Sequence, residues 1–447
     1  MLRTAFVLVI LAIGAWYSLR GPFQILLFYL WVAYFRPDQW LWFNFTGGLS
    51  SLIALVLVVA TVGSGARPRI GGALLFVLLL AHSLFSTLVS PVESYALPFW
   101  IEFAKVIVIC CLILALVTTE ERLRWVFVIM ALSLGFEGAR QGWAQLLTSP
   151  GTRNLNIWAL LGDSNGVAVG MLMLVPVLVA LLRTTAKPYE RWTLRALLIG
   201  VIYRALSTYS RGAFLAAIGL VAHILVHSRR RVVAVLVTVV IVCGALVVLP
   251  SSYWDRINTL RAPSDDSAMS RLYFWGVAWR MANDRPLVGY GHNAFEAVYD
   301  NYDVLHGAYG ENRAVHSAWF GMLAELGYPG LLLFLLIFGR SLLVGRHVRR
   351  LARQHPGLQT LAIYATACEA QLVVYAIGAT FLPLQYNELL WHVLAIGVAI
   401  RNIANTRARE AAGAPASASR EPAPVAVRLN IPPRAASSRP ALLSAGR

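Results

Sequence analysis

The sequence contains few charged residues and few cysteines. Only 13% of its 447 residues are charged, about half of the roughly 25% that soluble domains carry, whereas 58% are hydrophobic. The four cysteines lie inside apolar runs and form no CxxC pair, which excludes a disulfide scaffold and a cysteine zinc site. This composition indicates an integral membrane protein.

Lysine is almost absent, so arginine carries the positive charge. The chain has 38 Lys and Arg against 21 Asp and Glu, a net charge of +17, and its lysines are Lys105 and Lys187. A basic chain can bind nucleic acid, but Arg-rich loops also mark the cytoplasmic side of a membrane protein. Because Arg clusters occupy every second loop, topology explains the charge and we expect membrane lipids, not nucleic acid, as partners. The clusters assigned inside are 67–69, 122–124, 183–195, 229–231 and 340–353.

Apolar runs recur along nearly the whole chain. A helix needs roughly 20 apolar residues to cross a hydrocarbon core of about 30 Å, so the sequence predicts an all-α integral membrane protein with a bundle of about 12 transmembrane helices. Residues 1–35 hold two short runs broken at Arg20, Gly21 and Pro22, which fits two tilted spans or one span plus a re-entrant half. The clearer runs are 49–62, 73–89, 103–117, 125–139, 166–182, 193–206, 212–226, 232–249, 330–343, 361–381 and 389–400.

One long polar segment separates these runs. The loop 250–315 carries six Arg against eight Asp and Glu, and this near-neutral charge allows it to face outward. Within it, residues 266–283 place Met269, Leu272 and Trp279 at helical spacing, which predicts a helix lying against the membrane surface. We expect transmembrane helices over 1–249, with an Arg-bearing span entrance near 204–211, a periplasmic helical subdomain over 250–322, final spans over 323–403 and a disordered, basic cytoplasmic tail over 404–447.

Some arginines fall where the topology rule does not predict them. Arg204 and Arg211 flank a Ser-Thr-Tyr-Ser run between two spans, and a charge at the outer edge of a span is costly and usually functional. The guanidinium group suits phosphate oxygens, so these cations suggest a phosphate-bearing lipid substrate. The simpler alternative is that Arg211 reaches the outer headgroups. Further outward cations are Arg140, Arg271, Arg280, Arg285 and Arg313.

Histidine is the natural general base near neutral pH. His292, His306 and His316 lie in the outer segment, and His316 directly precedes a helix that leads into the next span. That position corresponds to the depth of a lipid headgroup, although a histidine at an interface is also often just a satisfied polar residue.

The acidic residues give weaker signals. Glu102 and Lys105 are spaced as a helical ion pair, and Asp163 precedes a span as a helix cap would. The outer acids form no DxD motif, and no nucleotide-binding fingerprint is present. We therefore expect no metal and no cofactor, and a substrate that is activated elsewhere.

Three motifs occur in order along the second half of the chain. They are Ser-Thr-Tyr-Ser-Arg-Gly at 207–212, Arg271 with Trp275 opening a helix followed by Pro-Leu-Val-Gly-Tyr-Gly-His-Asn-Ala-Phe at 286–295, and His-Ser at 316–317 with Glu-Leu-Gly-Tyr-Pro-Gly at 325–330. Together they resemble the O-antigen ligase superfamily over roughly residues 160–400. The run Leu-Trp-Val-Ala-Tyr-Phe-Arg-Pro at 30–37 is similar to the branch of O-glycosylation ligases associated with exosortase systems.

This resemblance implies a function and a set of site residues. Members of the superfamily transfer a glycan from undecaprenyl pyrophosphate at the periplasmic face of the bacterial inner membrane, to lipid A core in the ligases. Arg211 and Arg271 match the arginines that bind the donor pyrophosphate, and His316 matches the essential histidine. Arg140, Arg204 and Lys105 are further candidates for substrate binding. Ser317 departs from the commonest form, which has Asn after the histidine.

The sequence leaves the acceptor open. Besides a lipid A core ligase, a glycan polymerase or a protein O-oligosaccharyltransferase would use the same donor chemistry. A polyprenyl-linked glycan transporter is a more distant alternative, suggested by Glu102 and Glu369 within spans. Against it, the sequence shows no inverted repeat, and the polar candidates gather on one face instead of at the midplane.

Overall fold

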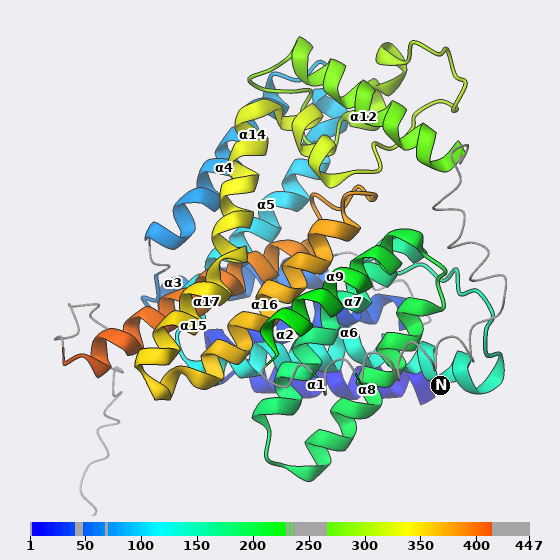
Figure 1. The fold of residues 1–447 in the computed structure, drawn as a ribbon. Coiled ribbons are helices and arrows are strands. Elements are labelled where there is room, and N and C mark those ends of the chain that lie inside the picture. The colour runs from blue at the N-terminus through cyan, green and yellow to red at the C-terminus, as the bar shows by residue number, and fades with distance from the viewer. Residues whose placement is uncertain are drawn as a thin grey trace, which may run out of the picture. The chain divides into compact units, whose positions relative to one another are not determined.

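The computed structural model describes residues 2–40, 48–67, 70–228, 232, 236 and 266–413. In these residues the regular secondary structure is helical, without a strand (Figure 1). Nearly all of the expected span 232–249, the Arg cluster 229–231, the start of the long polar loop and most of the tail lie outside the described residues. The helices are α1 Leu2–Ser18, α2 Pro22–Phe35, α3 Leu49–Gly63, α4 Ile70–Leu88, α5 Glu93–Leu116, α6 Glu120–Thr148, α7 Ser164–Thr184, α8 Pro188–Leu206, α9 Arg211–His227, α12 Asp266–Asp284, α13 Phe295–Val298, α14 Ala318–Leu342, α15 Val344–Gln354, α16 Gln359–Gly378 and α17 Glu388–Ala411.

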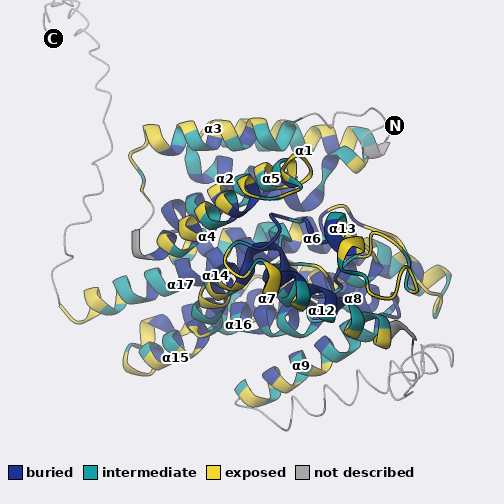
Figure 2. Cartoon of the chain, turned by 90° about the horizontal axis from the view of Figure 1, so that it is seen from above, coloured by how far each residue is buried: buried dark blue, intermediate teal, exposed yellow. Residues whose placement is uncertain are grey.

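The described helices confirm an integral membrane protein. Five segments are long and apolar enough to cross a membrane, namely α5, α7, the stretch Ala318–Gln354, the stretch Pro356–Gly378 and α17. Five more apolar helices are shorter: α1, α2, α3, α4 and α9. Around the centre of the bundle α7 and α16 are mostly buried, whereas α3 buries only one side (Figure 2).

The first 35 residues form the two helices α1 and α2, and how many times they cross the membrane stays a prediction. The chain breaks at Gly21, whose φ of 146° suits glycine, and Pro22 then opens α2 at a position that needs no amide donor. Arg122 at the start of α6 lies 5.2 Å from the Phe23 ring, and Arg140 near its other end lies 5.2 Å from Trp40. The α2 segment therefore runs beside α6 along most of its length.

Small residues allow α6 and α8 to pack closely. A methyl group on Gly142 would overlap the carbonyl oxygen of Gly200, and one on Gly200 would lie 2.7 Å from the backbone of Ala139. Only glycine at both positions permits this approach, as is usual for helices packed in membranes. The contact places the last turn of α8, with Arg204, against the C-terminal half of α6.

A second buried core lies above the ends of α4, α5 and α14 (Figure 1). It is formed largely by one side of α12, through Phe274, Val277 and Met281, and by the segment 290–299. The helix expected over 266–283 is thus confirmed. Its predicted apolar residues Met269, Leu272 and Trp279 are about half exposed. The reason is that α12 is apolar on two sides, and the protein core covers the side that carries Phe274, Val277 and Met281. The exposed side fits the expected membrane-surface position, which stays a prediction.

Candidate functional site

The centre of the site is α12, which carries Arg271 and Phe274 on adjoining turns. The imidazole of His316 lies against Phe274, with 5.9 Å between ring centroids. The Arg271 guanidinium lies 6.0 Å from the Phe381 ring, in the loop between α16 and α17. The charge of Arg271 acts on His316, so the structure brings together two of the residues that the motifs single out, each against its own aromatic ring.

The backbone of His316 is held in a rare conformation. Its φ is 49°, in the left-handed region, which costs a non-glycine residue roughly 1–3 kcal/mol and is concentrated at functional sites. The next residues are fixed to the α16–α17 loop, since the Ala318 amide donates to the Ala379 carbonyl at 2.8 Å and Trp319 Nε1 donates to Thr380 Oγ1 at 3.1 Å. The backbone that carries the imidazole is therefore held in place.

Ser317 does not orient the imidazole through a hydrogen bond in this arrangement. Its hydroxyl oxygen is buried and has no hydrogen-bond partner among the described residues. Serine has a shorter side chain than the asparagine expected after the histidine. The constraint on His316 that the structure shows is therefore its backbone φ.

The surroundings of His316 favour its neutral form. Burial lowers the pKa of His316 below its ordinary value of 6.5, and the nearby cations Arg271 and Arg313 lower it further. Arg313 is exposed and lies 5.7 Å from the Phe274 ring, which also contacts the histidine. An unprotonated imidazole at neutral pH is the form that accepts a proton.

Asp163 is the residue that sequence reasoning missed. It caps α7, as expected, since its carboxylate accepts from the Gly166 amide at 2.8 Å and from Asn165 Nδ2 at 2.7 Å. In addition, its negative charge opposes the lowering of the pKa of both Arg271 and His316. Asp163 therefore shares one electrostatic environment with them. In the sequence, the role of a helix cap accounts for Asp163, and nothing in its spacing indicates that it also lies near Arg271 and His316.

The start of α9, which carries Arg211, lies in the same region. Arg211 opens α9 directly after Ser210, whose hydroxyl caps the helix by accepting from the Ala213 amide at 3.3 Å. A methyl group on the next residue, Gly212, would touch the Phe381 ring at 3.6 Å. The start of α9 and Arg271 of α12 therefore meet at one aromatic ring, and the helix N-terminus adds a positive dipole end there.

Arg140 and Arg204 belong to a separate polar network. Both oxygens of Glu137 accept from Arg140, at 2.8 and 2.6 Å, and Gln141 donates to the same carboxylate at 2.8 Å. Arg204 is only 1% exposed; its Nε donates to Gln141 Oε1 at 3.1 Å and its Nη2 to the Asn156 carbonyl at 3.0 Å. These bonds anchor the loop between α6 and α7. A substrate contact by either cation stays a prediction.

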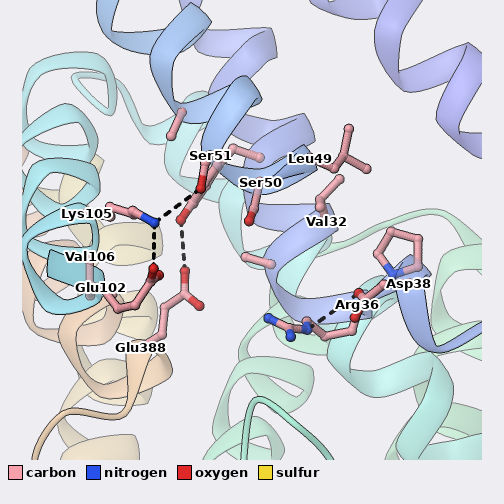
Figure 3. A pocket seen from close by; sticks show the side chains of 14 residues that line it. Val32, Arg36, Asp38, Leu49, Ser50, Ser51, Glu102, Lys105, Val106 and Glu388 are labelled. Carbon is pink, nitrogen blue, oxygen red and sulfur yellow. Dashed lines mark hydrogen bonds and ion pairs between the residues drawn. The ribbon is translucent and has the colours of Figure 1, made fainter. Parts of the chain in front are cut away.

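Lys105 lines a different cavity, of about 130 Å³, between α2, α3, α5 and α17 (Figure 3). Its ammonium donates to Glu102 at 2.7 Å and to Ser51 at 3.3 Å, which confirms the expected ion pair. On other walls, Arg36 faces Asp38 at 3.6 Å and Tyr29 donates to Glu388 at 3.1 Å. The lining residues do not include His316, Arg271 or Arg211, so the structure does not join Lys105 to them.

The other two outer histidines differ from His316. His292 is 1% exposed and packs on Tyr386 with 3.6 Å between ring centroids. Burial lowers its pKa to about 3, so it is a neutral core residue. His306 is exposed on its loop. Of the three, His316 alone is half-buried beside arginine.

Two parts of the chain match known protein families. Residues 196–335 match the O-antigen ligase family, and residues 1–184 match a family of unknown function. No curated protein matches the chain at a significant level. The first match includes Arg211, Arg271 and His316 and confirms the resemblance drawn from the motifs. The resemblance of the N-terminal run stays a prediction.

Proposed function

Since residues 196–335 belong to the O-antigen ligase family, which supports a glycan-processing glycosyltransferase in the membrane, we propose the following specific activity. The protein transfers a glycan from undecaprenyl pyrophosphate to a hydroxyl of lipid A core, at the periplasmic face of a bacterial inner membrane. The observation that carries this proposal is the neutral His316 beside Arg271 on the Phe274 side of α12.

His316 takes the role of general base in this proposal. Its imidazole accepts the proton of the acceptor hydroxyl while that oxygen attacks the anomeric carbon of the donor glycan. The bond from the anomeric carbon to the pyrophosphate oxygen breaks, and its electron pair stays on that oxygen. This single displacement inverts the anomeric configuration.

The arginines stabilise the leaving group. Arg271 of α12 and Arg211 at the start of α9 offer charge and hydrogen-bond donors to the departing pyrophosphate. Because the donor is already activated and the positive charge comes from side chains, the reaction needs neither nucleotide nor metal. Asp163 limits the mutual repulsion of Arg271 and protonated His316 during the step.

The topology follows from the expected twelve spans. The α12 subdomain then faces the periplasm together with the starts of α7 and α9, whereas the Arg-rich α15 and the C-terminus face the cytoplasm. The division into spans over 1–249, periplasmic subdomain over 250–322 and final spans over 323–403 belongs to this proposal. The last helix continues past residue 403, to Ala411.

The structure gives the transporter alternative little support. Both acids that suggested it have cationic partners, since Glu102 pairs with Lys105 at 2.7 Å and Glu369 pairs with Arg349 at 2.5 Å. Paired carboxylates of this kind are explained by local charge balance.

The test is a reconstituted assay with purified protein, undecaprenyl pyrophosphate glycan and lipid A core, without nucleotide or added metal. We expect glycan on the acceptor with wild type and with the matched control His306→Ala, but not with His316→Ala. Longer carrier-linked glycan in place of product would shift the activity to a polymerase. Absence of any transfer with lipid A core and with carrier-linked glycan would leave a protein hydroxyl as the acceptor to assay, and would overturn the ligase proposal.

A further inference from the structure

A cluster of ligand-type side chains lies at the far end of α9 from Arg211. His223 and His227 are one turn apart on α9, with 4.2 Å between ring centroids. Glu369 of α16 faces them, and one ligand atom from each of the three residues lies within 4.8 Å of the other two. Because α9 has 17 residues, and a helix rises about 1.5 Å per residue, this cluster lies roughly 20 Å from the start of α9 and takes no part in the proposed transfer.

The two histidines are prepared for binding a cation. His227 Nδ1 lies 2.9 Å from the His223 carbonyl oxygen, and because a carbonyl only accepts, this nitrogen carries the proton. The lone pair is thereby placed on Nε2, as the second hydrogen bond of a metal-bound histidine usually does. His223 has only 7% of its side chain exposed, and its Nε2 has no hydrogen-bond partner among the described residues. It lies 3.8 Å from Glu369 Oε2, which is too long for a hydrogen bond.

The carboxylate is also fixed in place. Arg349 Nη1 donates to Glu369 Oε2 at 2.5 Å and to Thr366 Oγ1 at 3.1 Å, whereas Arg349 Nη2 lies 3.5 Å from Glu369 Oε1. The guanidinium therefore orients one oxygen and leaves the other less engaged. A methyl group on Gly345 of α15 would overlap Glu369 Oε2, so glycine is required there for the carboxylate to keep this position.

We propose that His223, His227 and Glu369 bind a divalent transition-metal ion of the zinc type. Two imidazoles and one carboxylate are a ligand set that suits such ions, with a water molecule in the fourth position. A bound ion would use the buried nitrogen of His223, which otherwise has no partner among the described residues, and would join α9 to α16. The patterns in the sequence predict no metal for the reaction itself, and this site does not alter that, because its role is to hold α9 and not to act on substrate.

Metal binding to the purified protein tests the proposal without any transfer assay, so its outcome is independent of the proposed function. The protein is purified with a tag that lacks histidine, treated with chelator and titrated with Zn²⁺. We expect one equivalent per chain and an increase in Tm. His227→Ala, which is at the half-exposed end of α9, should weaken binding at least tenfold and abolish the increase in Tm.

The matched control is His347→Ala on α15, whose ring bonds to Asn405 at 2.7 Å, outside the cluster; it should bind as wild type does. Glu369→Gln is a second test, and Co²⁺ absorption gives a signature of the ligand geometry if that variant folds poorly. Less than one equivalent bound by wild type, or equal affinity in His227→Ala and wild type, would overturn the proposal.

Discussion

Two groups of outer arginines look alike in the sequence and differ in the structure. Arg140 and Arg204, the anchored group, are held by Glu137, Gln141 and a backbone carbonyl, so both guanidinium groups are fixed to the protein by hydrogen bonds. Arg271, in the α12 group with Arg313, instead lies over an aromatic ring beside a neutral histidine. A cation at the edge of a span therefore becomes a substrate-binding candidate only when its surroundings leave donors for a ligand.

The largest effect is expected from His316→Ala. Loss of a general base lowers the rate by about 10²–10⁴-fold, whereas donor binding and Tm should change little because the imidazole is half-buried and its backbone is held by neighbouring bonds. The measurement is single-turnover transfer with saturating donor. His306→Ala, an exposed histidine of the same segment, should retain the wild-type rate. A rate within threefold of wild type in His316→Ala would remove it from the base role.

Arg271→Ala should have the next largest effect and distinguishes the two arginine groups most directly. Losing one preorganised charge on a leaving group lowers kcat by about 10²–10³-fold, and Arg271→Lys should restore only part of it, since an ammonium lacks the planar fork. Arg140→Ala is the control from the anchored group, with an expected decrease below tenfold. Steady-state kinetics over a range of donor concentrations give kcat for both alanine variants. Equal losses in the two variants would end the distinction between the groups.

Arg204→Met should affect stability more than catalysis. The change removes the guanidinium donor to the Asn156 carbonyl and one of the two donors to Gln141 Oε1, which keeps Asn156 Nδ2 at 3.5 Å. A hydrogen bond from a charged donor contributes about 1.5–3 kcal/mol. We therefore expect the free energy of unfolding to fall by about 2–4 kcal/mol, while the rate per folded molecule falls less than tenfold. Thermal unfolding in detergent and transfer rates corrected for the folded fraction separate the two effects. If Arg204→Met kept the wild-type Tm but lost the transfer activity, Arg204 would be a substrate-binding candidate like Arg271 and not a structural anchor.

Much of the fold could be predicted from the sequence, because apolar runs and helical periodicity are local properties. The helices over 49–63, 164–184 and 266–284 follow from such patterns. Local patterns cannot show which of two apolar sides of a helix becomes buried. The spacing in α12 singles out Met269, Leu272 and Trp279, which are about half exposed. The side that the protein core covers instead carries Phe274, Val277 and Met281.

The candidate site was predictable in part for a related reason. The motifs indicate Arg271 and His316 because the residues that make up each motif are neighbours in the sequence. The same kind of reasoning also indicates Arg204 as a substrate-binding residue, although its guanidinium is buried. The positions of Asp163, and of Glu369 opposite His223, depend on packing between helices far apart in the chain. No spacing rule within one segment contains that information.

The smallest expected effect is a shift in pH dependence, and it concerns the α12 group alone. Because burial and the cations Arg271 and Arg313 lower the pKa of His316 below 6.5, its base form persists to lower pH than in a free histidine, and the rate should decline only on acidification below that value. Arg313→Gln removes one of these cations from an exposed position, so the acid limb should move upward, toward the ordinary value, with the plateau rate nearly unchanged. The pH profile of kcat gives both the position of the acid limb and the plateau rate. An anchored-group variant such as Arg140→Gln should leave the limb where it is, and an unshifted limb in Arg313→Gln would show that this cation does not act on the base.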